Sequence, residues 1–576
     1  MEDGLGLLLA RADDHRPALA PRLPAPAPAQ VERRATTSRL RDDGADPNDL
    51  RAQRWGVLAP LGEAGDRMLA AIRPLIELRS AQQGAEAPIY RAPFIAAADV
   101  ALRWKKKLFE TGADLSLEVP RYLLILGELD QISLVQQQVQ AIDGFVGRLA
   151  FAREADFAAY AGKVVAAERR VHGPPRALLM TARDGSEATE RGRQALILPS
   201  LEIVRKRLAA GQFPACEPES LDGEHPDPDA LLARAAAPTP TVLLSLSHGE
   251  GPPAAGWSSA ALQRERQGAM CFGAAGTIAA GDVAARPFLP DGAWFMFACN
   301  SAGTPTGSAF RPWLEVLGRH NRELAGVLAT LPGPGDRPFT AALPRAALAN
   351  PRGPLVFFGH IDLAWTYSFR ECDRGVFDRP ARFTAILRAL LRGDRAGVAL
   401  RELLRFLDQA NTELLSLYDG AAQARSLGLA ARSDDARLGY LWMLRQDLAA
   451  YVLLGDPAVR LPHAGAAATT APSRVEDIRT APPTHAPPRP EDTRPTAATP
   501  APPRPEVNAP ASLDAPASRT SGPSTTALEE AVLQALLAGT AIQLAADRVG
   551  LPRPELERVA AEYREKGRVA LERRGT

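Results

Sequence analysis

The chain has 576 residues, 46% of them hydrophobic, so it is long enough for several domains and can bury a sizeable core in at least part of its length. Its 68 Lys and Arg residues nearly balance its 67 Asp and Glu residues, and a net charge of +1 gives no overall attraction to nucleic acid or to a membrane surface. Its four cysteines contain no CxxC pair, which argues against a disulfide framework and favours a reducing, cytoplasmic compartment.

Residues 1–53 are predicted to form a weakly ordered leader. The stretch APRLPAPAPAQ favours extended polyproline conformations, and the stretch TTSRLRDDGADPNDLRAQR is mostly charged and polar. The short apolar run near the start has no basic segment before it, so we do not interpret it as a signal peptide. No apolar stretch reaches the roughly 20 residues that a membrane span needs, and no membrane partner is expected.

Residues 54–463 alternate between short apolar runs and helical patterns. The runs YLLILGEL, RALLMTA, TVLLSLSHG, AWFMFACN and PLVFFGHI occupy residues 122–129, 176–182, 241–249, 293–300 and 354–361. Continuous apolar runs of this length are typical of strands buried on both faces of a parallel sheet. Amphipathic stretches such as 155–171 and 195–211 lie between them. The pattern predicts an α/β fold with a doubly wound, mostly parallel sheet and flanking helices.

The C-terminal part is predicted to consist of a linker and a small module. Residues 464–524 are rich in Pro, Ala and Thr and have almost no large apolar side chains, so they are expected to remain a disordered tether. Residues 525–576 read as helix, turn at Gly550, and helix, which predicts an all-α module similar to a helix-turn-helix. Its acids and bases nearly balance, so both an adaptor role and nucleic-acid binding stay open.

Two motifs end predicted strands with residues that can carry chemistry. LSLSHGEG ends in His248 and Gly249, and FMFACNSAG places Cys299 after an apolar run, with His first and Cys roughly 50 residues later. A thiol nucleophile needs a base within hydrogen-bond reach, and parallel strands that end at one sheet edge can supply it. The N–H groups of Gly249 and Cys299 are the candidate oxyanion donors.

The structural alternative for each residue is a buried core position. Free cysteine is among the most buried residue types, and a histidine before glycine is usually structural. The joint pattern favours chemistry, because both residues end strands in the expected order. His360, in FFGHID, has no such setting and serves as the comparison histidine.

Five motifs together resemble the caspase-fold cysteine peptidases, in particular the gingipain-like branch and related bacterial caspase homologues of the CHAT type. They are SHGEG, FACNSAG, FVGRLAF with FAAYAGKVVAAE, GHIDLAWTYSF and YVLLGDPAVRLP, and the resemblance covers residues 54–463. It implies an N-terminal α/β subdomain at 54–175 and a caspase-like catalytic domain at 176–463. It also implies a cysteine-type endopeptidase without metal or organic cofactor.

Carried over by motif, the resemblance assigns Cys299 as the nucleophile and His248 as the general acid and base. Asp184, in LLMTARDGSEATERG, matches an acid that assists the histidine, although a turn aspartate before glycine is the alternative. Trp365 matches a tryptophan that lines the first specificity pocket, with a core aromatic residue as the alternative. Glu187 and Glu190 lie near the acid of that pocket and suggest a weak preference for a basic P1 residue, although solvated loop charges would look the same.

Regulation is predicted from arginines in the unfolded flanks, such as those in VERRATTSRLR and APSRVEDIR, which are accessible to cleavage. We expect a zymogen in a bacterial proteolytic signalling or antiviral defence cascade, with protein substrates and an upstream activating protease. The module at 525–576 would recruit a nucleic acid or an adaptor. Two rival functions stay open: a catalytically silent caspase-fold scaffold, and a DNA-associated regulator that acts through the C-terminal module.

Overall fold

The computed structural model describes the strands β1 (Gly4–Leu5) and β2 (Leu23–Pro24), and nine longer segments of the chain. These segments are residues 45–110, 119–212, 216–223, 227–253, 256–319, 321–333, 335–371, 376–427 and 434–463. The chain divides into the units Met1–Glu476 and Asp477–Thr576, and all described residues lie in the first. The linker and module predicted at 464–524 and 525–576, and most of the leader, lie outside the described residues.

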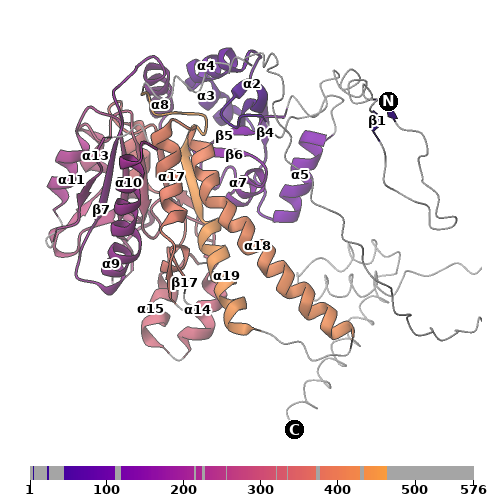
Figure 1. Ribbon diagram of the computed structural model, residues 1–576, viewed down its shortest axis with the longest axis vertical. Coiled ribbons are helices and arrows are strands. Elements are labelled where there is room, and N and C mark those ends of the chain that lie inside the picture. The colour runs from indigo at the N-terminus through magenta and orange to yellow at the C-terminus, as the bar shows by residue number, and fades with distance from the viewer. Residues whose placement is uncertain are drawn as a thin grey trace, which may run out of the picture. The chain divides into compact units, whose positions relative to one another are not determined.

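A ten-stranded sheet forms the centre of the described unit (Figure 1). In chain order its strands are β3 (Trp55–Pro60), β4 (Ile89–Ala92), β5 (Tyr122–Leu126), β6 (Phe145–Leu149), β7 (Arg176–Thr181), β8 (Glu219–Leu221), β9 (Thr241–Leu246), β13 (Ala293–Phe297), β16 (Val356–His360) and β19 (Tyr451–Gly455). The spatial order is β4-β3-β5-β6-β19-β16-β13-β9-β7-β8. Within this sheet only the β16–β19 pair is antiparallel.

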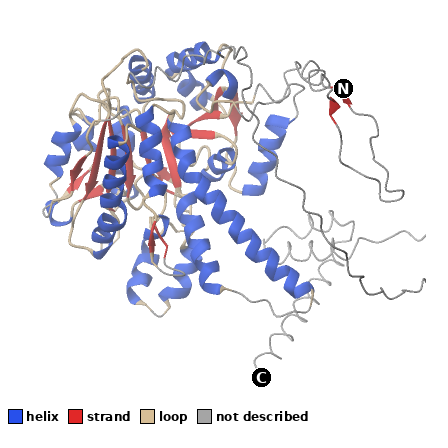
Figure 2. Cartoon of the chain, viewed as in Figure 1, coloured by secondary structure: helices blue, strands red, loops and turns tan. Residues whose placement is uncertain are grey.

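Helices flank this sheet, as Figure 2 shows by the strands lying between them. The α-helices are α2 (Leu50–Gln53), α3 (Glu63–Ala71), α4 (Arg73–Gln83), α5 (Ala98–Glu110), α7 (Leu134–Ala141), α8 (Glu154–Ala167), α9 (Glu187–Gly192), α10 (Leu198–Ala209), α11 (Pro228–Ala235), α12 (Ala260–Arg266), α13 (Ala280–Ala284), α14 (Arg311–Gly318), α15 (Arg322–Thr330), α16 (Ala342–Ala349), α17 (Ala381–Arg392), α18 (Ala396–Ser426) and α19 (Asp435–Ala449). The predicted mixed α/β class with a mostly parallel sheet is therefore confirmed.

Three small antiparallel sheets lie outside the central one in chain segments that follow its strands. They are β10 (His248–Gly249) with β11 (Met270–Cys271) and β12 (Thr277–Ile278), β14 (Gly303–Thr304) with β15 (Phe339–Thr340), and β17 (Arg370–Glu371) with β18 (Phe377–Asp378). The first of these sheets carries His248, so it bears directly on the candidate site.

The middle strands have no polar face. All five residues of β13 and all six of β9 are buried, as expected for parallel strands covered by helices on both sides. Polar groups inside this layer are paired: the indole Nε1 of Trp294 donates to Ser245 Oγ at 2.8 Å. Each fully buried large apolar side chain contributes roughly 1.5–3 kcal/mol, so this layer is a main source of stability.

Four neighbouring parallel strands deliver their carboxyl ends to one edge of the sheet. The registers of β7, β9 and β13 place Leu246 opposite both Thr181 and Phe297, and β16 pairs with β13 on its other side. Because parallel strands in register end together, the segments that follow them meet at this edge. These segments carry Asp184, His248, Cys299 and Ala364.

The predicted strands are present but shorter than the apolar runs. The run 241–249 was expected to be one strand ending in His248 and Gly249, whereas β9 ends at Leu246 and these two residues pair with Cys271 and Met270 in a separate sheet. Similarly, Cys299 follows β13 by two residues and lies in a turn. Hydropathy does not mark the point where a chain leaves a sheet, because buried turns remain apolar.

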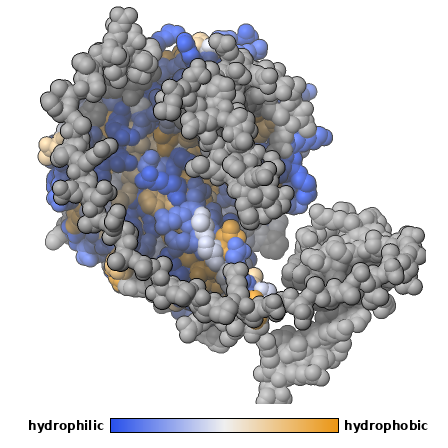
Figure 3. Space-filling model, turned by 45° about the vertical axis from the view of Figure 1, so that its right-hand side comes forward, coloured by the Kyte–Doolittle hydropathy of each residue, from blue (hydrophilic) through white to orange (hydrophobic). Residues whose placement is uncertain are grey.

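The central sheet also joins the parts predicted as 54–175 and 176–463. Strand β19, near the end of the second part, pairs with β6 of the first through Leu454 and Arg148. Figure 3 shows mostly hydrophilic side chains, with small hydrophobic patches, on the described surface that faces the viewer. Among the described residues, no helix is both long and apolar enough to cross a membrane.

Candidate active site

Cys299 lies in a tight turn between β13 and the short strand β14. Asn300 has a φ of 54°, a left-handed conformation that asparagine tolerates better than most residues. Its N–H donates to the carbonyl of Asp362 at 2.9 Å, and the N–H of Ala302 donates to the carbonyl of His360 at 2.9 Å. The turn is thus tied to the end of β16, which fixes the direction in which the thiol leaves the backbone.

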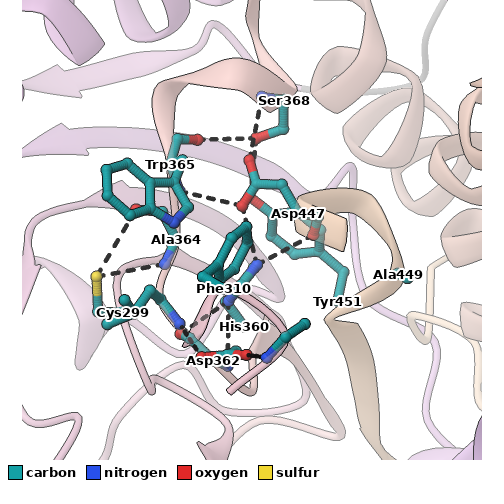
Figure 4. A network of polar contacts seen from close by, with 12 residues as sticks. Cys299, Phe310, His360, Asp362, Ala364, Trp365, Ser368, Asp447, Ala449 and Tyr451 are labelled. Atoms are coloured by element: carbon teal, nitrogen blue, oxygen red, sulfur yellow. Dashed lines mark hydrogen bonds and ion pairs between the residues drawn. The ribbon is translucent and has the colours of Figure 1, made fainter. Parts of the chain in front are cut away.

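The thiol is held by the backbone of Ala364 (Figure 4). The Ala364 N–H donates to Sγ at 3.3 Å, and Sγ lies 3.7 Å from the Ala364 carbonyl oxygen, to which it donates. Burial raises the pKa of the Cys299 thiol to about 11, and the charges of Asp447 and Asp362 add to this, while the Ala364 N–H opposes it. In this conformation the group is therefore a neutral thiol at neutral pH.

His248 stands at the open side of the same edge, with 46% of its side chain exposed. Its Nε2 is 3.0 Å from Ser186 Oγ and 3.5 Å from Asp184 Oδ2. These two partners favour the tautomer with the proton on Nε2, which leaves Nδ1 as the basic nitrogen. Nδ1 makes no hydrogen bond to another described residue.

Asp184 is nearly buried and held in one orientation. Its Oδ1 accepts hydrogen bonds from the Ser186 N–H at 3.0 Å and from Thr189 Oγ1 at 2.8 Å. Burial alone would raise the pKa of Asp184, but the hydrogen bonds from Ser186 and Thr189 and the charge of His248 outweigh it and hold the pKa below its ordinary value. An ionised carboxylate at this position can orient the imidazole and stabilise an imidazolium.

A glycine brings the histidine segment against the cysteine backbone. A Cβ atom at Gly249 would lie 1.9 Å from the carbonyl oxygen of Cys299, so only glycine allows this approach. His248 and Cys299 line a common cavity of about 60 Å³, which we call the Cys299 cavity. No direct hydrogen bond joins the thiol to the imidazole in this conformation. The structure thus brings Cys299, His248, Gly249 and Asp184 to one place, in the segments that follow β13, β9 and β7.

The proposed oxyanion donors lie at the same edge. The Cys299 N–H donates to no carbonyl among the described residues, so it is free to bind a developing oxyanion beside the nucleophile. Gly249 packs against the Cys299 backbone. The assignment of both N–H groups as an oxyanion site stays a prediction.

The three residues predicted to bind substrate lie outside the lining of the Cys299 cavity. Trp365 packs against Trp313 and Phe310, with ring centroids 5.4 and 5.8 Å apart, while its chain neighbours Ala364 and Thr366 line the cavity. Glu187 is exposed and pairs with Arg191, with Nε and Oε1 at 2.8 Å.

Glu190, on α9, is held by two arginines. It pairs with Arg183 and Arg193, each with an N–O distance of 3.3 Å. Both glutamates already have guanidinium partners, so neither presents a free carboxylate to the cavity. Their role in substrate binding stays a prediction.

A buried ionic network lies beneath the cysteine turn (Figure 4). His360 is fully buried, its Nε2 is 3.1 Å from Asp447 Oδ1, and its Nδ1 is 2.9 Å from the Asp362 carbonyl oxygen. Asp447 also accepts the N–H groups of Trp365 at 3.0 Å and Ser368 at 3.2 Å. Because both nitrogens of His360 are engaged, it is not available as a base for Cys299.

Sequence reasoning missed Ser186, Thr189, Ala364 and Asp447. Ser186 was detectable in principle, because it accepts the Thr189 N–H as the N-cap of α9. Ala364 acts only through its backbone and Asp447 lies at the end of a long helix, so neither carries a recognisable pattern.

Comparisons with known proteins give only distant likenesses. No family model matches the chain, and no curated protein matches it in sequence. The crystal structure of the Arg-specific cysteine proteinase gingipain R matches with a TM-score of 0.40 and 11% identity over 71% of this chain and 78% of that chain. A structure described only as a protease matches with a TM-score of 0.41 and 12% identity, over 72% and 79%.

A third likeness is to the complex of the pro- and mature domains of a Porphyromonas gingivalis gingipain, with a TM-score of 0.40 and 12% identity over 70% and 79%. Two of these structures are of gingipain cysteine proteinases and one is of a protease, all at low similarity. The function of this chain therefore has to be argued from its own residues.

Proposed function

We propose that the chain is a cysteine endopeptidase that cleaves protein substrates through Cys299 and His248. The observation that carries the proposal is that both side chains line one cavity at the carboxyl ends of neighbouring parallel strands. Gly249 packs on the Cys299 backbone and Asp184 lies behind the imidazole, which supports the proposal independently. Together these groups make up a nucleophile, a base and an orienting acid.

In the proposed reaction, His248 Nδ1 accepts the proton of Cys299 Sγ, and the thiolate attacks the peptide carbonyl. The N–H groups of Cys299 and Gly249 stabilise the oxyanion. The imidazolium then gives its proton to the leaving amine, so the C–N bond breaks and a thioester remains. Water, deprotonated by His248, hydrolyses the thioester and restores the thiol. Asp184 and Ser186 keep the proton on Nε2 throughout.

The resting state of the thiol supports a regulated enzyme. Sγ is bound to the Ala364 peptide and its pKa is raised to about 11, so chemistry requires that the hydrogen bonds between Sγ and the Ala364 peptide be broken. We therefore include a zymogen in the proposal, activated by cleavage in the Arg-containing flanks. The proposal also includes an upstream protease that makes this cleavage and a partner that binds residues 525–576. It places the enzyme in a bacterial defence cascade.

The same resting state also favours a second candidate, a catalytically silent scaffold on this fold. A thiol that stays neutral and bound to a backbone amide is a poor nucleophile. The two candidates differ in whether any treatment of the full chain releases Cys299 activity.

The test is cleavage of an unstructured protein and of a mixed peptide-reporter library by the full chain, intact and after limited proteolysis. We expect activity in at least the nicked chain, lost in both Cys299→Ala and His248→Gln, with Cys271→Ala as the matched cysteine control. Internal new termini identify an endopeptidase. Activity that survives Cys299→Ala contradicts the proposal, and silence in every state favours the scaffold.

The sequence also predicts a preference for a basic P1 residue, from Glu187 and Glu190. The same peptide library tests this prediction, because its members differ at P1. Both glutamates are paired with arginines and lie outside the cavity lining.

A further inference from the structure

The walls of the Cys299 cavity are mostly apolar around the nucleophile, and the hydroxyl residues Thr189, Ser247 and Thr366 are the uncharged polar part of the lining. Leu246, Phe297 and Phe369 line it, together with the methyl groups of Ala188, Ala298 and Ala364. These residues come from four separate places: the end of β9, the end of β13, the first turn of α9 and the segment after β16. The cavity is therefore a composite feature of the sheet edge, directly beside Sγ and the imidazole.

The floor of the cavity is rigid because it belongs to the core. Phe369 is fully buried and Phe297 nearly so, and their rings pack edge to face with centroids 5.2 Å apart. Both rings also pack on Phe383, with centroid distances of 5.7 Å from Phe297 and 6.5 Å from Phe369. Enlarging the cavity downward would require displacing a close-packed aromatic cluster, which folded cores resist.

The cavity offers no partner for a charged side chain. Apart from Cys299 and His248, none of the residues that line it is ionisable. The hydroxyl of Thr189 is already donated to Asp184, and the hydroxyl of Ser247, which makes no hydrogen bond, is a neutral group that cannot act as a counter-ion. A guanidinium, ammonium or carboxylate placed here would lose its water without gaining a counter-ion, and that costs far more than the burial of its stem returns.

The size of the cavity sets a second limit. Its volume is about 60 Å³, and roughly 10–15 Å³ of such volume is enough to hold one water molecule. It therefore has room for a side chain of a few heavy atoms and not for an arginine, lysine or large aromatic residue.

We propose that the Cys299 cavity is the P1 pocket and that it selects peptides with a small, uncharged P1 residue of the alanine, serine or valine class. This inference rests on the proposed peptidase function. It follows from position, because the side chain next to the scissile carbonyl must lie beside both Sγ and the imidazole. Hydroxyl and methyl groups are accepted alike, since an apolar pocket discriminates poorly against a hydroxyl isostere.

The first experiment compares fluorogenic tetrapeptides that differ only at P1, using the full chain intact and after limited proteolysis. We expect kcat/KM for P1 Ala, Ser or Val to exceed that for P1 Arg, Lys, Asp or Phe by on the order of 100-fold. Equal or greater rates with Arg or Lys would overturn the inference and leave the peptidase proposal standing. Failure to cleave any peptide or protein in either state, or cleavage that survives Cys299→Ala, would overturn the peptidase proposal itself.

The second experiment places a carboxylate at the rim without touching the floor. Ala188 is exposed, so Ala188→Asp leaves the packing intact and should raise the ratio of Arg to Ala cleavage by at least about tenfold. Ala188→Asn is the matched uncharged control and should leave the ratio unchanged. Glu187→Gln should also leave it unchanged, because Glu187 lies outside the cavity; a fall in basic-P1 cleavage on Glu187→Gln would overturn the inference.

Discussion

Two buried ionic networks in the described unit differ in what they hold. In the first, the carboxylate of Asp456 accepts from Trp55 Nε1 at 2.9 Å and from Arg79 Nε at 2.8 Å, and Arg79 also pairs with Glu168 at 2.7 Å. It joins side chains from β3, α4 and the segment after β19, which are far apart in the sequence.

In the second network, Asp447 pairs with His360, and its carboxylate also accepts hydrogen bonds from the backbone N–H groups of Trp365 and Ser368. These belong to the segment that carries Ala364 and holds the thiol. The first network thus fixes regular elements to one another, whereas the second fixes an irregular segment beside the nucleophile. The first network therefore stabilises the fold, whereas the second holds the segment that binds the Cys299 thiol and helps to keep that thiol protonated.

The largest expected effect is on the first network. Asp456→Ala removes the partner of a fully buried arginine, whose pKa burial alone would lower but which Asp456 and Glu168 raise. Arg79 then keeps only Glu168 as a carboxylate partner and Trp55 Nε1 loses its acceptor, so the free energy of unfolding should fall by about 3–5 kcal/mol. Denaturant unfolding of the full chain measures it. The control is Asp99→Ala, which breaks an exposed pair with Arg103 and should leave stability unchanged; similar losses in the two variants would contradict the assignment.

A smaller loss of stability and a larger change in reactivity are expected from the second network. Asp447→Asn removes a charge that raises the Cys299 pKa and weakens hydrogen bonds to the segment around Ala364. We expect a loss of about 1–3 kcal/mol in stability and a roughly tenfold faster alkylation of Cys299 at pH 8.

Iodoacetamide labelling followed by mass spectrometry of the Cys299 peptide provides the measurement for Asp447→Asn. In the wild type the rate should keep rising with pH toward about 11, because burial keeps the thiol protonated below that value. Asp408→Asn, on the exposed face of α18, is the control. An unchanged labelling rate in Asp447→Asn would show that the network does not govern the thiol.

The smallest effect is the pH dependence of the second network. Burial alone would lower the pKa of His360, but its hydrogen bond to Asp447 and the charges of Asp447 and Asp362 raise it above 6.5. A raised pKa in the folded state means that the charged form stabilises the fold fully below about pH 6.5, and that this contribution is lost as pH rises through the folded-state value.

The measurement is the difference in unfolding free energy between wild type and His360→Gln across that range. It should shrink, on the order of 1 kcal/mol, as pH rises above about 6.5. The exposed histidine variant His248→Gln is the matched comparison. A difference that stays constant or grows with pH would contradict the charged pair.

The sequence by itself determined the elements that follow from local pattern. Apolar runs predicted β5, β7, β9, β13 and β16, whereas His248 and Cys299, expected at the strand ends, each follow their strand by two residues. The strand prediction works because burial on both faces requires continuous apolar residues.

The tertiary structure alone decided the strand order that places β9 beside β13, and the contacts that hold the thiol. Ala364 acts through its N–H, which every residue but proline has, and Asp447 reaches Trp365 across 82 residues of chain. Backbone donors and long-range carboxylates leave no local pattern in a sequence, since their effect depends on which segments fold side by side. The same reason explains why the apolar lining of the Cys299 cavity emerged only from the fold.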